Sequence, residues 1–217
     1  MPRIVKHDDR RRQICDALLD TVADAGLNGA TIRAVADRSG WSTGVIGHYF
    51  RGRQDLLLGG LRRAAEILAE HNTRVLDTLD GLQALEQILE GSVPLDGRRL
   101  ALSRIFFFFF VEAMTDPALR QEVETYLVGW RKSVARAIKR AQEAGDIPPD
   151  VNRKAIAIDL VGLVDGLSIH ALVDDAIMTH LREQSPVRFW LRRLTAPGSF
   201  SKSPDRAIQR TASSSAE

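Results

Sequence analysis

Apolar residues recur with a helical period along almost the whole chain. Between Asp9 and Ala25 they stand at i, i+3, i+4, i+7, i+8 and i+11, which places them on one stripe of a helix. No segment alternates apolar and polar residues with period two over the length of a strand. The pattern therefore predicts an all-α fold, in which amphipathic helices pack around a shared core.

Caps and helix breakers divide this pattern. Gly26 ends the first helix, Thr31 and Ser42 are placed to cap the second and third, and Gly40 separates those two. The fourth helix runs on to Asp80. Further helices are expected at 82–91, 99–114, 116–144, 152–177 and 186–195. The last stretch, 197–217, is polar and rich in Ser and Pro, which is typical of a disordered tail.

Composition excludes several classes of function. The one cysteine, Cys15, leaves no internal disulfide and no cysteine-based zinc site. No common catalytic or nucleotide-binding motif occurs, so we expect no enzyme, no catalytic residues, no metal and no cofactor. The longest apolar run, 105–111, is too short to span a bilayer, and the charged first residues do not resemble a secretory signal. We therefore expect a cytoplasmic protein without a membrane partner.

Basic residues gather at the amino-terminal end. Residues 1–63 contain eleven Lys and Arg against seven Asp and Glu, a net charge of +4 within a chain of net charge +2. Such a segment favours a polyanion as its partner, but a basic surface that meets only solvent has the same composition.

Two glycines interrupt the short third helix. Gly44 and Gly47 each cost a helix about 1 kcal/mol relative to alanine, and they lie opposite the apolar Ile46 and Phe50. One explanation is that a DNA duplex comes close to the helix backbone at this surface. The other is that the glycines permit close packing against a neighbouring helix.

The detailed string around these glycines is more specific than a generic helix-turn-helix. Residues 31–57, "TIRAVADRSGWSTGVIGHYFRGRQDLL", resemble the TetR family of transcriptional regulators, and "STGVIGHYF" is similar to its BetI-like branch. The likeness extends over about residues 9–195, with departures at Trp41, Gly47 and Arg53. It implies a helix-turn-helix DNA-binding domain at 1–52, a helical effector-binding and dimerisation domain at 53–196, and the tail at 197–217.

The resemblance also implies which residues meet double-stranded DNA. Thr43 would reach a base edge, while Thr31, Arg33 and Arg53 would contact the phosphate backbone. Trp41 is expected to cover the turn. The predicted DNA-binding set is Thr31, Arg33, Ser42, Thr43, Gly44, Gly47, His48, Tyr49 and Arg53.

Five consecutive phenylalanines, 106–110, cover every side of their helix, so this helix is expected to be buried nearly all round. They are either plain core or the lining of a cavity, as the family resemblance implies. The resemblance to the BetI-like branch also suggests an aromatic cage there, which would suit a quaternary ammonium ligand. The predicted effector-binding set is His71, Phe106, Phe107, Phe110, Tyr126, Trp130 and Asp165.

The segment 152–177 is apolar on more than one side, and Gly162 and Gly166 allow close approach of another helix. With 186–194 it predicts a four-helix interface in a two-fold homodimer. Asp165 and His170 are either a buried pair across that interface or ligand contacts. The predicted interface set is Val161, Val164, Leu172, Phe189, Trp190 and Leu194.

Together these features predict a repressor that a small-molecule effector releases from a pseudo-palindromic operator. The alternative is a helical binding or enzyme-like protein with a vestigial helix-turn-helix.

Overall fold

The structure is a computed structural model that describes residues 3–195; the predicted tail at 197–217 lies outside them. The described chain is helical and contains no strand, which confirms the all-α prediction. Within residues 3–195, no helix is long and apolar enough to cross a membrane. The helices are α1 (Arg3–Gly29), α2 (Ile32–Ser39), α3 (Thr43–Tyr49), α4 (Arg53–Thr78), α5 (Gly81–Glu90), α6 (Gly97–Glu112), α7 (Pro117–Glu143), α8 (Arg153–Ala171), α9 (Asp175–Glu183) and α10 (Pro186–Thr195).

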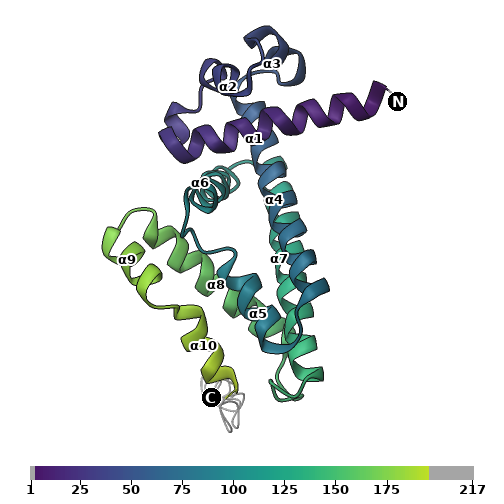
Figure 1. Cartoon of the computed structure of the whole chain (residues 1–217), viewed down its shortest axis with the longest axis vertical. Helices are drawn as coiled ribbons and strands as arrows, with labels where there is room; N and C mark the ends of the chain where they lie inside the picture. Colours follow the sequence, from purple (N-terminus) through teal and green to yellow (C-terminus); the bar gives the residue numbers. More distant parts are fainter. Residues whose placement is uncertain (1–2, 196–217) are drawn as a thin grey trace, which may run out of the picture.

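Helices α1 to α3, called the head below, form one end of the molecule, and α10 ends at the other (Figure 1). Local chemistry sets the head's helix ends. The Thr31 hydroxyl accepts the Ala34 N–H at 3.1 Å, and the Ser42 hydroxyl accepts the Val45 N–H at 3.2 Å. Between them Gly40 has a φ of 73°, which suits glycine and ends α2. The predicted caps of α2 and α3 are therefore confirmed.

Two apolar clusters hold the described chain together. The first joins the head to α4 and α6, with Ile14, Leu18, Phe50, Ile105 and Phe109 all at 1% exposure or less. The second joins α5, α7, α8 and α10. Because burial of one such side chain contributes about 1.5–3 kcal/mol, the first cluster fixes α6 firmly to the head. This core crosses the domain boundary expected at residue 53.

Two expectations about the helices were wrong. The segment 152–177 is not one helix, because α8 ends at Ala171 and α9 begins at Asp175. The Asp174 carboxylate accepts the Ala176 N–H at 2.8 Å and so caps α9 separately. Helix α6 is also not buried all round: of its five phenylalanines only Phe109 is fully buried, because α6 borders a cavity.

Candidate nucleic-acid interface and ligand cavity

The glycines of α3 lie on an open surface. Gly44 and Gly47 are exposed, together with Thr43 and His48. A Cβ on Gly47 would meet nothing within 4 Å, and one on Gly44 would meet only the Ser42 hydroxyl at 3.8 Å. Within the described chain, no neighbouring helix packs on this surface. The explanation by internal packing therefore fails, and the surface is free for an external partner.

The opposite face of α3 anchors it. Ile46 and Phe50 are buried at 0% and 1% exposure. The Arg11 side chain of α1 donates to the Tyr49 carbonyl at 3.1 Å and lies over the Phe50 ring at 4.5 Å. This guanidinium satisfies a carbonyl at the end of α3 and fixes the helix orientation.

The other residues of the predicted DNA-binding set also lie on the head, except Arg53, which is the first residue of α4. Arg33 is exposed, and Thr31 and Ser42 are exposed while they cap their helices. Tyr49 is half-buried. Arg53 is exposed, but it donates to the Ala30 carbonyl at 3.3 Å and the Leu27 carbonyl at 2.5 Å. In this structure Arg53 thus connects the start of α4 to the last turn of α1 and the link between α1 and α2 by hydrogen bonds.

Sequence reasoning missed two neighbours of α3. His7 and Arg10, on the first turns of α1, border a hollow whose other side is formed by Ser42, Gly44, Val45, His48 and Tyr49. The His7 and Tyr49 rings lie 4.5 Å apart, and Arg10 lies 5.3 Å from the centre of the Trp41 ring. The basic composition of residues 3–12 was the only signal in the sequence for this role.

A cavity of about 530 Å³ lies among α4, α6, α7 and α8, a size typical of small-molecule sites. Six of the seven predicted effector-binding residues line it, namely Phe106, Phe107, Phe110, Tyr126, Trp130 and Asp165. The placement of His71 differs from the expectation. Its Nε2 lies 3.4 Å from the Gln87 carbonyl, and the next residue, Asn72, lines the cavity in its place.

Asp165 differs electrostatically from the other charged residues of the cavity. It makes no hydrogen bond or ion pair with the rest of the described chain, and burial raises its pKa to about 7 against the opposing charge of Arg131. In contrast, Arg62 of α4 holds Glu122 of α7 at 2.9 and 3.2 Å. Mainly because of this hydrogen bonding, the pKa of Glu122 is lowered; Glu122 also accepts from the Tyr126 hydroxyl.

The expected dimer contacts divide into two groups. Val161 and Val164 are buried at 4% and 1% in the chain's own core, so their side chains are not on an open face. Leu172 and Leu194 are half-buried, while Phe189 and Trp190 are exposed. The open apolar face of α8 and the turn after it consists instead of Ile158, Ile169 and Val173, at 57%, 43% and 85% exposure. Gly162 and Gly166 lie on that face, and a Cβ on either would meet nothing within 4 Å.

Helix α6 connects the cavity to the head. Its phenylalanines line the cavity on one side, and elsewhere on the same helix the Arg104 side chain donates to the carbonyls of Val22 at 2.9 Å and Ala23 at 3.2 Å in α1. At the start of α6, Arg98 bonds Asp16 of α1 at 3.2 Å. Helix α6 is thus hydrogen-bonded to α1 at both Arg98 and Arg104.

A three-helix head with an open, capped recognition helix, joined to a helical body with a ligand-sized cavity, defines a DNA-binding regulator with its own ligand-binding domain. Residues 14–59 match the family model "Bacterial regulatory proteins, tetR family", and residues 81–196 match "BetI-type transcriptional repressor, C-terminal". The chain belongs to the TetR family of transcriptional regulators. It is a regulator rather than an enzyme, and the vestigial alternative is set aside.

Named relatives support the same family, and solved structures share the fold. The transcriptional regulator BetI of Escherichia coli K12 is 28% identical over 205 residues, which is 88% of this chain and 96% of that protein. BetI of Escherichia coli O139:H28 is 30% identical over 79% of this chain and 86% of its own. A regulator from Saccharomonospora viridis, solved in complex with choline, is 24% identical with a TM-score of 0.67, covering 81% of this chain and 95% of its own. A TetR regulator from Haloarcula marismortui has a TM-score of 0.70 at 20% identity, covering 87% of this chain and all of its own.

Proposed function

We propose that this regulator is a homodimeric repressor, acting in the cytoplasm, that an organic cation releases from a pseudo-palindromic operator. The observation that carries the proposal is the Asp165 carboxylate, unpaired within the described chain, in a cavity lined by aromatic rings. An ammonium group would replace the missing counter-charge and would gain cation–π attraction from the rings. The choline bound to the similarly folded Saccharomonospora viridis regulator supports the same ligand class.

On the DNA side, the open α3 surface supports a direct role in sequence recognition. Thr43 is exposed on this surface and would reach a base edge, and the bare backbone at Gly44 and Gly47 would permit close approach to the groove. His7, Arg10 and Arg33 would contact phosphates and fix the position of the head on the duplex.

Dimerisation would use the open face of α8 together with α10. Ile158, Ile169 and Val173 share this face with the two bare glycines, and Phe189 and Trp190 add aromatic area on α10. A two-fold dimer through these helices would place two α3 helices in successive major grooves.

The proposed switch runs through α6. A cation in the cavity contacts the α6 phenylalanines, and α6 transmits the displacement to α1 through Arg98 and Arg104. By linkage, effector and operator then weaken each other's binding by the same factor.

The test is binding of the full-length protein to the DNA that flanks its own coding region, with and without choline or betaine aldehyde. We expect specific DNA to bind about 10³-fold more tightly than random DNA, with a log–log salt slope of about −0.9 per phosphate neutralised. A cation should weaken operator binding. Equal affinity for both DNAs, or release by neutral or anionic compounds alone, would contradict the proposal.

A further inference from the structure

The charged residues that line the cavity leave one position for a ligand charge. Arg62 is paired with Glu122, Glu66 lies 3.2 Å from Arg63, and Arg99 lies 2.6 Å from Asp96. Among the charged lining residues, Asp165 alone makes no such bond within residues 3–195. Asp165, on α8, is therefore the side chain with which a cationic ligand group would pair.

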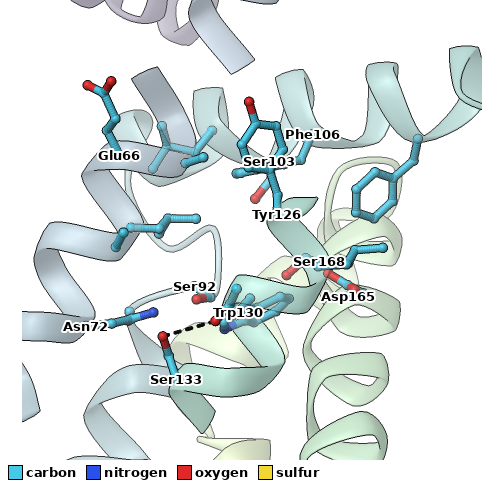
Figure 2. Close-up of a pocket in the computed structure, with 18 of the residues that line it drawn as sticks. Glu66, Asn72, Ser92, Ser103, Phe106, Tyr126, Trp130, Ser133, Asp165 and Ser168 are labelled. Atoms are coloured by element: carbon cyan, nitrogen blue, oxygen red, sulfur yellow. Dashed lines mark hydrogen bonds between the residues drawn. The ribbon is translucent and has the colours of Figure 1, made fainter. Parts of the chain in front are cut away.

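Three buried polar atoms of the lining also have no partner in the described chain: Asn72 Oδ1, Trp130 Nε1 and Ser168 Oγ. Asn72 and Ser168 are only 3% exposed. Figure 2 shows Trp130 of α7 between Asn72 of α4 and the Asp165–Ser168 pair of α8. Because buried polar groups are nearly always hydrogen-bonded, unpartnered polar atoms on three residues of one cavity lining favour a polar ligand group beside them.

The chemistry of these atoms restricts that group. An indole N–H only donates, so the ligand must present an acceptor oxygen to Trp130. The Ser168 hydroxyl can donate or accept, and it lies one helical turn from Asp165 on the same face. The oxygen therefore lies close to the cationic centre, as it does in a hydroxyl or an ester of an amino alcohol.

The cavity is also larger than choline. Seven heavy atoms at about 30 Å³ each occupy about 200 Å³, well under half of the 530 Å³ present. Beyond the rings that an ammonium head can contact, the lining along α6 and α7 is also apolar and includes Leu102 and Leu127. A hydrocarbon portion of the ligand would fill the remaining space and pack against these apolar side chains.

We propose that the cavity takes an amphiphilic cation larger than choline: an ammonium head at Asp165, an acceptor oxygen at Trp130 and Ser168, and an apolar chain along α6. This rests on the cationic effector proposed above and extends it. Acylcholines have this arrangement of groups, and alkyltrimethylammonium ions of equal length have the head and chain without the ester.

The experiment is calorimetric titration of the full-length protein with choline, butyrylcholine, octanoylcholine and the length-matched alkyltrimethylammonium ions. We expect affinity to rise roughly threefold per added methylene until the cavity is full, so that butyrylcholine binds at least tenfold more tightly than choline. Each ester should bind about five- to tenfold more tightly than its alkyl match, since it satisfies two buried groups.

Three variants locate the groups. Trp130→Phe keeps an aromatic ring and removes the indole N–H, and Ser168→Ala removes the hydroxyl. The double variant should bind each ester no more tightly than its alkyl match, while affinity should still rise with chain length. Gly129 lines the cavity and a Cβ there meets nothing within 4 Å, so we expect the larger side chain of Gly129→Leu to occupy part of the cavity. Gly129→Leu should weaken the binding of octanoylcholine at least tenfold and the binding of choline less than twofold. Gly129→Ala is the matched control.

The outcomes separate the two proposals. If choline binds as tightly as its esters, the larger ligand is wrong while the cationic effector stands. If the esters gain nothing over alkyl ions, or keep their gain in the Trp130→Phe, Ser168→Ala variant, the oxygen assignment is wrong. If none of the cations binds, both this inference and the cationic effector fall.

Discussion

Substitution of Asp165 by Asn should stabilise the free protein at alkaline pH. Burial raises the pKa of this carboxyl from 3.8 to about 7, so the folded chain keeps a proton that the unfolded chain has lost between about pH 4 and pH 7. The unfolded state then binds fewer protons, and the free energy of unfolding falls as pH rises. Above pH 7 the native protein holds an unfavourable carboxylate, which asparagine removes.

The magnitude follows from the shift. One pKa unit corresponds to about 1.4 kcal/mol, so a shift of about three units gives about 4 kcal/mol as an upper bound. Asp165 keeps partial contact with water, and we expect about half of this, about 2 kcal/mol. For a chain of this length that corresponds to about 4–8 °C in Tm.

The assay is urea and thermal unfolding of the parent and Asp165→Asn proteins at pH 5 and pH 8. Protein concentration is held fixed because the proposed dimer would couple stability to concentration. The free energy of unfolding and the Tm of Asp165→Asn should exceed those of the parent at pH 8 and equal them at pH 5. Glu66→Gln is the control: it also lines the cavity, but its carboxylate is paired with Arg63, so no alkaline gain is expected.

The same substitution should weaken cation binding. Parent affinity for a cation should fall about tenfold per pH unit below pH 7, because the cation requires the ionised carboxylate, and Asp165→Asn should bind weakly at every pH. An equal stability difference at pH 5 and pH 8 would refute the reasoning. It would mean that another group, such as Arg131, already neutralises the carboxylate in solution.

Three further predictions concern the remaining surfaces. Gly47→Ala should raise the free energy of unfolding in urea by about 0.5–1 kcal/mol, because the added methyl group meets no atom within 4 Å. The same variant should bind the operator at least tenfold more weakly in a fluorescence titration. Unchanged operator affinity would show that α3 does not meet the DNA. Arg104→Met removes the hydrogen bonds to the α1 carbonyls and should lower the free energy of unfolding by about 1.5–3 kcal/mol. It should also reduce the factor by which effector weakens operator binding. An unchanged factor would mean that coupling between cavity and head does not pass through Arg104. Ile158→Glu should shift the protein from dimer to monomer in sedimentation velocity, whereas Val111→Glu, at a similarly exposed position on α6, should leave the dimer intact; a dimeric Ile158→Glu protein would move the interface elsewhere.

The parts of the fold that sequence predicts well depend on local chemistry. Thr31, Gly40 and Ser42 define helix ends through bonds within a few residues, so their roles can be read without tertiary structure. The boundary between α8 and α9 was missed because apolar residues continue at helical spacing across it. Its only local signal is Asp174, which caps α9.

The cavity depends on tertiary packing and was only partly predictable. A run of phenylalanines identifies an apolar helix, but sequence cannot distinguish a filled core from a void, since Phe109 is buried while Phe106 lines the cavity. His71 and Asn72 are adjacent on α4 and point about 100° apart, so a small rotation of the helix decides which one faces the ligand. The unpartnered polar atoms have no sequence signature.

Glycines in helices are of two kinds in this chain, and only the structure separates them. On α4, a Cβ at Gly59 would lie 2.6 Å from a Phe50 ring atom and one at Gly60 would lie 2.6 Å from Leu18, so these glycines permit internal packing. On α3 and α8, a Cβ at Gly47, Gly162 or Gly166 would meet nothing within 4 Å. A helical glycine that costs about 1 kcal/mol without any internal contact contributes only when another molecule lies against it. Helices α3, α7 and α8 carry such glycines, and on this argument they should meet partners: DNA at α3, the effector at Gly129 of α7, and a second copy of the chain at α8.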